Sequence, residues 1–185
     1  MRIDRPRLDP VRDSEATPGQ LEVLGRVRRP DGTALNIFRT LAHHPDLMRR
    51  WMVFGNHVLA KSTLEDRDRE LLILRIGWLC RAEYEWGQHV QIARSCGVTD
   101  DEIRRIQAGP EAAGWTDADR TLLRAADDLH RDQLISSSVW EALSRRLDVH
   151  QLMDLVFTVG QYTLVSMALN SFGVQLDDGA PGFEV

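Results

Sequence analysis

The stretch that decides the fold is residues 71–79, which read Leu-Leu-Ile-Leu-Arg-Ile-Gly-Trp-Leu. Wound into a helix from about residue 64 to residue 80, this stretch is apolar on almost every side. A helix that is apolar all round has to be covered by other elements on all of its faces. We therefore expect this helix to lie at the centre of the protein.

Helix start signals recur on both sides of the central stretch. Capping boxes stand at Thr17 and Thr99, and a third is read at Ser138; each pairs a hydroxyl with a Glu or Gln three residues later. Thr63 is expected to cap the central helix. The helices predicted with both ends cover about residues 18–27, 45–61, 64–80, 83–96 and 149–172. No alternating stretch bounded by hairpin turns appears, so we predict an all-α bundle of about eight or nine helices.

The last predicted helix contains the longest apolar stretch, residues 152–169. Polar residues such as Asp154 and Gln161 interrupt it, so it falls short of the roughly 20 mostly apolar residues that a membrane span needs. We expect a buried helix that ends at Gly173, with its burial completed by other subunits. Residues 177–182 are predicted to form a tail.

Length and composition are those of one globular domain. The chain has 185 residues, a net charge of −5, 43% apolar and 28% charged residues. This balance excludes a disordered chain and argues against nucleic acid as the main partner. The N-terminus resembles neither a signal peptide nor a transit peptide, and Cys80 and Cys96 form no Cys-x-x-Cys motif, so a cytoplasmic location is expected.

Three ionisable residues are the candidates for chemistry. Glu70 lies on the apolar central helix, where a carboxylate is costly unless it is paired or protonated. Glu85 and His89 are four residues apart on the next helix, an arrangement suited to an acid–base pair. Two alternatives stay open: the pair is a solvated ion pair, or Glu70 only holds a neighbouring helix through Arg75 or Arg81. No cluster of metal ligands is evident, so no metal is expected.

Several blocks of the sequence resemble the carboxymuconolactone decarboxylase family, which includes the AhpD-like alkylhydroperoxidases. They are residues 69–75, 84–90 and 97–103, with weaker support from residues 36–45 and 152–173. The resemblance covers about residues 30–175 of a single domain 1–185, with residues 1–16 and 175–185 as arms or tails. It implies an AhpD-like fold, a homo-oligomer (trimer, hexamer or dimer) and a small-molecule substrate bound near subunit contacts, without nucleic acid or membrane.

The resemblance also shows where this chain departs from the redox-active branch of the family. In that branch a Glu is followed by Cys-x-x-Cys and then by a His. Aligning these on Glu70 and His89 places the two cysteine positions on Ala82 and Glu85, so both thiols are missing. The decarboxylase branch instead carries a Glu four residues before the His, as Glu85 stands before His89 here.

The leading hypothesis is therefore a cofactor-free decarboxylase or related lactone-processing enzyme. Glu85 and His89 would be its acid–base pair and Glu70 would tune them. Tyr84 is expected to line the pocket, Trp86 to line it or to belong to the core, and Arg75 or Arg81 to hold a substrate carboxylate. The alternatives are a peroxidase or disulfide reductase that uses Cys80, and a non-catalytic oligomeric ligand-binding protein.

Overall fold

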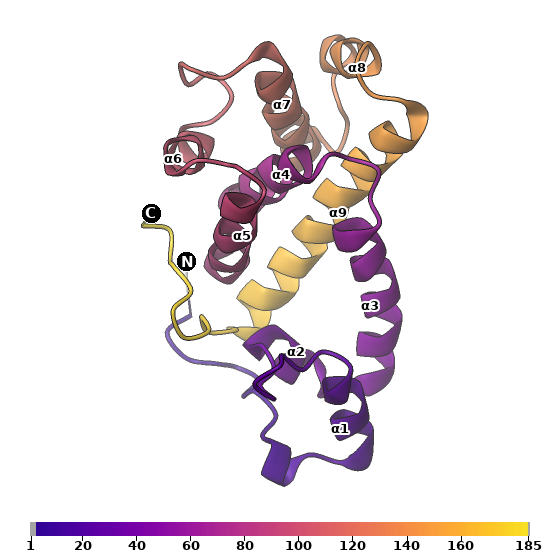
Figure 1. Ribbon diagram of the computed structural model, residues 1–185, viewed down its shortest axis with the longest axis vertical. Helices are drawn as coiled ribbons and strands as arrows, with labels where there is room; N and C mark the ends of the chain where they lie inside the picture. Colours follow the sequence, from indigo (N-terminus) through magenta and orange to yellow (C-terminus); the bar gives the residue numbers. More distant parts are fainter. Residues whose placement is uncertain (1–2, 185) are drawn as a thin grey trace.

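The computed structural model describes residues 3–184, whose regular structure is entirely helical (Figure 1). A short 3-10 helix at Asp13–Glu15 precedes the α-helices, which are α1 (Pro18–Gly25), α2 (Asn36–Leu41), α3 (Pro45–Ala60), α4 (Asp66–Leu79), α5 (Glu83–Ser95), α6 (Asp100–Ala108), α7 (Asp117–Asp132), α8 (Ser137–Ser144) and α9 (Val149–Phe172). The predicted all-α fold of eight or nine helices is confirmed for this part of the chain.

Helix α4 lies at the centre of the molecule, as its sequence predicts. Every residue from Asp68 to Gly77 is buried. Helices α5, α7 and α9 pack around it (Figure 1). Because the helix is covered on all sides, its four charged residues in this range need partners inside the protein. Glu70 is paired with Arg69 and His89, whereas Arg75 is paired with Asp127 on α7.

Helix α9 runs through the length of the bundle and contacts α3, α4, α5, α7 and α8. Asp148 and Gln151 form a capping box at its start, and Gly173 ends it in the left-handed conformation at φ 68°. By length and composition α9 could cross a membrane, but half of its most apolar 18-residue window is buried inside the protein. This burial fits the predicted core helix.

Helices α1, α2 and α3 form a lobe with a core of its own. Val23, Leu24 and Met48 are fully buried within it, separately from the main core around α4. Helix α3 is long enough to leave this lobe and run beside α9 (Figure 1). Helices α3 and α9 thus connect the lobe to the region of α4 and α5, and a cavity lies between the lobe and α5.

The C-terminal segment is ordered against the helices although it has no helix of its own. The ring of Phe183 contacts those of Trp78 and Trp86, at centroid distances of 5.0 and 5.9 Å. Asp177 accepts hydrogen bonds from Tyr84 Oη and from Gln88 Nε2. The predicted tail is therefore irregular, but it packs onto α4 and α5 rather than extending away from them.

Two predicted caps do not form. Ser138 lies inside α8, whose N-cap residue is Ser136, and Thr63 makes a tertiary contact. The side chain of Thr63 does not cap α4, whose N-cap residue is Glu65. Instead the backbone N–H and the hydroxyl of Thr63 both donate to Oδ2 of Asp154 on α9, at 2.6 and 2.8 Å. Because α4 begins two residues later than expected, Thr63 is not at its cap position, and its hydroxyl makes a charge-assisted hydrogen bond to α9 instead.

Substitution of a glycine on α5 tests how tightly the C-terminal segment is packed. A methyl group at Gly87 on α5 would overlap the backbone oxygen of Pro181 and press on Leu176. We predict that Gly87→Ala lowers the free energy of unfolding by about 2 kcal/mol, because backbone and side chain both have to move. Urea denaturation followed by circular dichroism measures this change.

Gly160 provides the matched control on α9. A methyl group there meets no heavy atom within 4 Å. Gly160→Ala should therefore raise the free energy of unfolding by up to about 1 kcal/mol through helix propensity alone. Equal effects of the two substitutions would contradict the close packing of residues 176–181 on α5.

Candidate active site

Helices α4 and α5 bring the three candidate ionisable residues together. Nδ1 of His89 lies 2.7 Å from Oε2 of Glu70, and Nε2 of His89 lies 3.1 Å from Oε1 of Glu85. All three side chains are buried. One imidazole therefore bridges two carboxylates, one on each ring nitrogen.

This arrangement favours the protonated imidazole. Burial by itself would lower the pKa of His89, but the charges and hydrogen bonds of Glu70 and Glu85 outweigh burial and raise it to about 10. At neutral pH His89 is thus a cation with an N–H on both nitrogens. Each N–H donates to a carboxylate, which fixes the orientation of the ring.

The two carboxylates have different surroundings. Glu70 is completely buried and also accepts from Nε of Arg69 at 3.2 Å, so two cationic groups hold it. Glu85 has His89 as its ion-pair partner among the described residues and borders a cavity. Glu70 is therefore a fixed anchor for the imidazole, whereas the Glu85–His89 pair faces space that a ligand can occupy.

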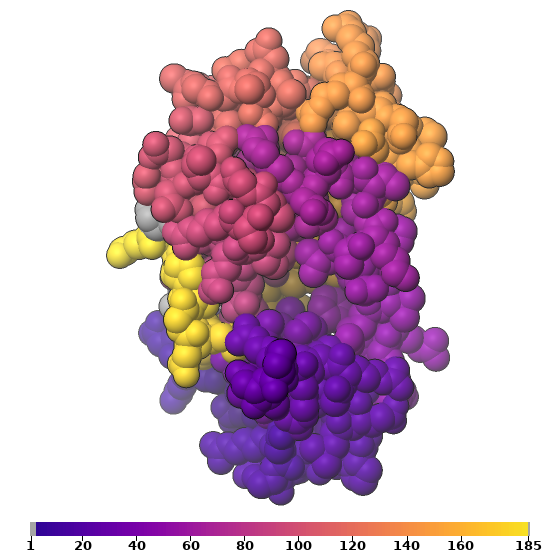
Figure 2. Space-filling model, in the orientation of Figure 1, coloured from indigo at the N-terminus to yellow at the C-terminus, as the bar shows by residue number. Residues whose placement is uncertain are grey.

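The cavity has a volume of about 240 Å³ and lies between α3, α5, α9 and the start of α2. Figure 2 shows a hollow in this region, between α5, α3 and the N-terminal lobe, with α9 at its floor. Apolar side chains such as Phe38 and Ile92 form most of the wall. The polar side chains in the lining are Asn56, Glu85, Gln88, His89 and Gln161.

Two buried polar atoms in this lining lack a hydrogen-bond partner. They are Nε1 of Trp51 on α3 and Oε1 of Gln161 on α9. Buried polar groups are nearly always satisfied, so a free donor and a free acceptor at one cavity mark it as a place for a polar ligand or water. The sequence offered a signal for Gln161, a polar residue in an apolar helix, but none for Trp51.

Tyr162 completes the wall next to the imidazole. Its ring meets that of His89 edge-on, with 4.9 Å between the centroids. Burial, followed by the charges of Glu85 and Glu70, raises the pKa of Tyr162 well above its ordinary value. The phenol therefore stays neutral and adds an apolar face and a hydroxyl group to the site.

Tyr84 and Trp86 lie outside this cavity. The hydroxyl of Tyr84 donates to Asp177, and its ring borders a separate small pocket next to Leu169. Trp86 is fully buried in the main core beside Trp78. Adjacent positions on a helix point in different directions, so Glu85 faces the cavity while its two neighbours do not. Tyr84 therefore does not line the cavity as expected, whereas Trp86 takes the core position that was the alternative for it.

The two arginines are not in the site either. Arg75 forms a two-point ion pair with Asp127 on α7, at 2.6 and 2.9 Å, and donates to the backbone oxygen of Ile106. Arg81 is exposed at the turn between α4 and α5. The expectation that Arg75 or Arg81 holds a substrate carboxylate is corrected for this reason: Arg75 already has a carboxylate, and neither residue lines the cavity.

Both cysteines are free thiols. Sγ of Cys80 lies 3.8 Å from Nδ1 of His130, and burial raises the pKa of Cys80. A raised pKa disfavours the reactive thiolate. Within residues 3–184 no group of three or more His, Cys, Asp and Glu side chains is arranged to hold a metal ion.

Comparison with known proteins supports the family that the sequence resembles. Residues 45–128 match the carboxymuconolactone decarboxylase family, a range that contains Glu70, Glu85 and His89. The resemblance predicted from the sequence is confirmed. No curated protein sequence matches the chain.

Solved structures share the fold at low sequence identity. A peroxidase-related protein with an alkylhydroperoxidase AhpD core from Ralstonia eutropha JMP134 has a TM-score of 0.80 at 18% identity, covering 95% of both chains. A peroxidase-related protein from Silicibacter sp. TM1040 also has a TM-score of 0.80, at 14% identity, covering 98% of this chain and 100% of that one. The debrominase Bmp8, solved as a C82A variant with 2,3,4-tribromopyrrole, has a TM-score of 0.74 at 13% identity, covering 95% and 94%. The AhpD-like fold is thereby confirmed.

The raised pKa of His89 predicts a pH dependence of stability. Its pKa is about 10 in the folded chain against an ordinary value of 6.5, so its contribution is fully present below pH 6.5 and is lost as the pH rises through about 10. The free energy of unfolding should fall across this window, by an upper limit of about 5 kcal/mol. Denaturant titrations at several pH values measure the slope.

Two histidine variants show whether this pH dependence of the free energy of unfolding comes from His89 or from other titrating groups. His89→Gln should lack it, whereas His150→Gln, which changes an exposed histidine, should keep it. Identical slopes in both variants would show that His89 is not charged in the folded protein.

Proposed function

Because residues 45–128 match the carboxymuconolactone decarboxylase family, we propose that this chain is a cofactor-free acid–base enzyme, a decarboxylase or related lactone-processing catalyst. The observation that carries the proposal is the Glu70–His89–Glu85 arrangement at the edge of a cavity. It supplies a proton where a small substrate can reach it. A merely solvated ion pair would not be buried in this way.

Decarboxylation needs few groups from the protein. The bond between the carboxylate carbon and its neighbour breaks, CO₂ leaves, and the bonding electrons move into the adjacent unsaturated lactone. A proton then forms a new C–H bond. The Glu85–His89 pair holds a proton between Oε1 and Nε2, so it is suited to act as the general acid.

The composition of the cavity wall favours loss of the substrate carboxylate as CO₂. No Arg or Lys side chain is among the described residues that line the cavity. A carboxylate surrounded by apolar groups is costly to keep charged, and its departure as neutral CO₂ removes that cost. The imidazolium of His89 and neutral donors such as Nε1 of Trp51 are suited to the lactone oxygens.

Glu70 is proposed as a positioning residue. It holds Nδ1 of His89 and is itself held by Arg69, so it fixes the ring with Nε2 pointed at Glu85. Removing its charge would lower the basicity of His89 without removing a group that contacts substrate. Its loss should therefore shift the pH profile more than it reduces the maximal rate.

Substitution of the acid–base pair tests the proposal. With γ-carboxymuconolactone and its analogues as substrates, we expect Glu85→Gln and His89→Ala to lower kcat by a factor of about 10² to 10⁴. The loss of lactone absorbance and the release of CO₂ measure turnover. Glu111→Gln, which changes an exposed carboxylate paired with Arg124, is the control and should retain wild-type kcat. Turnover that both site variants retain would refute the assignment.

The peroxidase alternative rests on Cys80, because Ala82 and Glu85 occupy the family's cysteine positions. The raised pKa of Cys80 weighs against it. Peroxide consumption by the wild-type protein that disappears in Cys80→Ser would support it. Consumption that persists when both cysteines are replaced, or no consumption at all, would remove it.

Assembly into a homo-oligomer remains part of the proposal. Apolar side chains are exposed along α3 and α9, where the rings of Phe54 and Phe157 lie 6.0 Å apart and both are partly exposed. Exposed apolar patches of this kind are typical of subunit contacts. Light scattering should give a mass above that of one chain, and Phe157→Glu should reduce it; a wild-type monomer would refute this part.

A further inference from the structure

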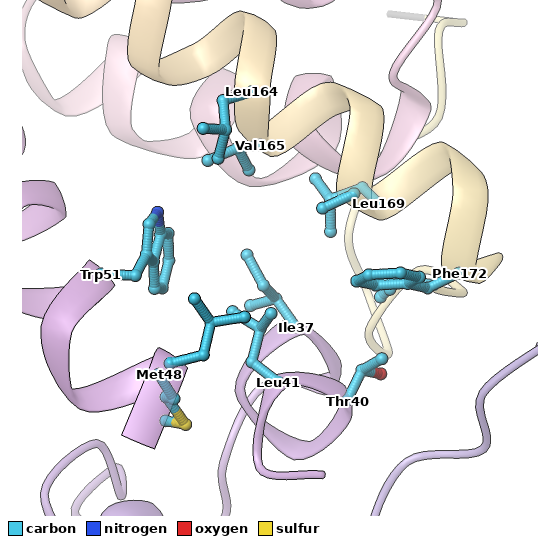
Figure 3. A pocket seen from close by; sticks show the side chains of 12 residues that line it. Ile37, Thr40, Leu41, Met48, Trp51, Leu164, Val165, Leu169 and Phe172 are labelled. Carbon is cyan, nitrogen blue, oxygen red and sulfur yellow. The ribbon is translucent and has the colours of Figure 1, made fainter. Parts of the chain in front are cut away.

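A second cavity adjoins the first. It has a volume of about 190 Å³ and lies between α2, the start of α3 and the last turns of α9. Figure 3 shows its wall, to which Met48, Leu169 and Phe172 contribute. Apart from Thr40, the side chains that line it are apolar. We call this cavity the apolar chamber, and the cavity beside His89 the polar chamber.

The two chambers share part of their walls. Ile37, Trp51 and Val165 line both. In Figure 3 the nitrogen of Trp51 lies at the edge of the ring that is farther from Met48 and Leu41. The unpartnered Nε1 therefore belongs to a residue that stands between the two chambers and lines both of them.

Gly55, which lines the polar chamber, lies close to the side chains of both Gln161 and Trp51. A methyl group at Gly55 would lie 3.5 Å from Nε2 of Gln161 and 3.7 Å from the indole of Trp51. The side chains with the two unsatisfied atoms therefore approach the same point of α3. A free donor and a free acceptor at one place match a group that has both functions, or a carbonyl next to a hydroxyl.

From this arrangement we propose that the substrate is amphipathic. Its reacting polar end lies in the polar chamber at Glu85 and His89, and an alkyl or aryl substituent passes Trp51 into the apolar chamber. An apolar protein cavity of about 150 Å³ binds benzene, so 190 Å³ has room for a phenyl ring or an alkyl chain of similar size. This inference rests on the proposed function for the reacting end only.

The depth of the apolar chamber suits a small-molecule ligand better than the side chains of a partner protein. Thr40, Met48 and Leu169 are 2%, 0% and 3% exposed, so the chamber reaches into the core. Its rim is exposed at Leu47 and Leu164. A second copy of the chain that covers this rim would close the chamber, and the experiment has to separate that case from ligand binding.

Binding of straight-chain primary alcohols, whose hydroxyl group both donates and accepts, tests the proposal without turnover. Calorimetry with the series from propan-1-ol to decan-1-ol should show affinity rising about fourfold per methylene until the chamber is full, and then levelling off. Ala168→Phe fills the apolar chamber from α9 and should weaken octan-1-ol binding at least tenfold while propan-1-ol binding stays unchanged. Ala168→Leu provides a smaller plug, with an intermediate loss, if the phenylalanine variant does not fold.

Met167→Phe is the matched control, because Met167 is 64% exposed on the same helix and lines neither chamber. It should bind the whole series as the wild type does. Affinity that does not depend on chain length, or a dependence that Ala168→Phe and Ala168→Leu leave unchanged, would overturn the proposal. Octan-1-ol binding that appears only after Leu164→Asp dissociates an oligomer would assign the chamber to a second copy and also overturn it.

The same experiment separates this inference from the catalytic proposal. A chain-length dependence that Ala168 controls, together with no turnover of carboxylated lactones, would keep the apolar chamber and reject decarboxylation. Turnover of carboxylated lactones without any chain-length dependence of binding would keep decarboxylation and reject the apolar chamber as a binding site.

Discussion

The buried carboxylate of Glu70 is the constraint on which the site depends. It lies on a helix that the rest of the protein covers completely, where an unpaired charge would cost several kcal/mol. Arg69 from its own helix and His89 from the next one compensate it. Because His89 must reach Glu70, α5 packs against α4 in one register, and that register brings Glu85 to the cavity. The same contact thus stabilises the core and orients the imidazole.

The central helix carries its charges at places where other elements supply partners. Arg75, on another part of α4, is neutralised by Asp127 of α7 and by a backbone oxygen at the end of α6. The Glu70 end faces α5 and a cavity, whereas the Arg75 end is filled by protein. This difference makes one buried set of charges a candidate active site and leaves the other a structural link, although Glu70 and Arg75 lie on the same helix.

Local sequence signals predicted the helices well, and they failed where a distant residue competes. The capping boxes at Thr17 and Thr99 involve residues three apart and formed as predicted. Thr63 instead binds Asp154, ninety-one positions away, and no local pattern carries that information. Helical spacing placed Glu85 and His89 on one face, and the apolar surroundings of Glu70 marked it as the third candidate. The partners of Arg75, and the meeting of Trp51 with Gln161, depend on how separate helices pack, which spacing along the chain does not determine.

Glu85 explains how a fold shared with peroxidase-related proteins can support different chemistry. A cysteine at this position would offer a thiol that can be oxidised, whereas the carboxylate offers a charge and a site for a proton. That second negative charge, added to Glu70, helps to raise the pKa of His89 to about 10. With one carboxylate fewer, the imidazole would lose its proton more readily. Under the proposed function, a carboxylate in place of a thiol therefore changes more than one side chain, because it also favours the protonated form of His89 that would act as the acid.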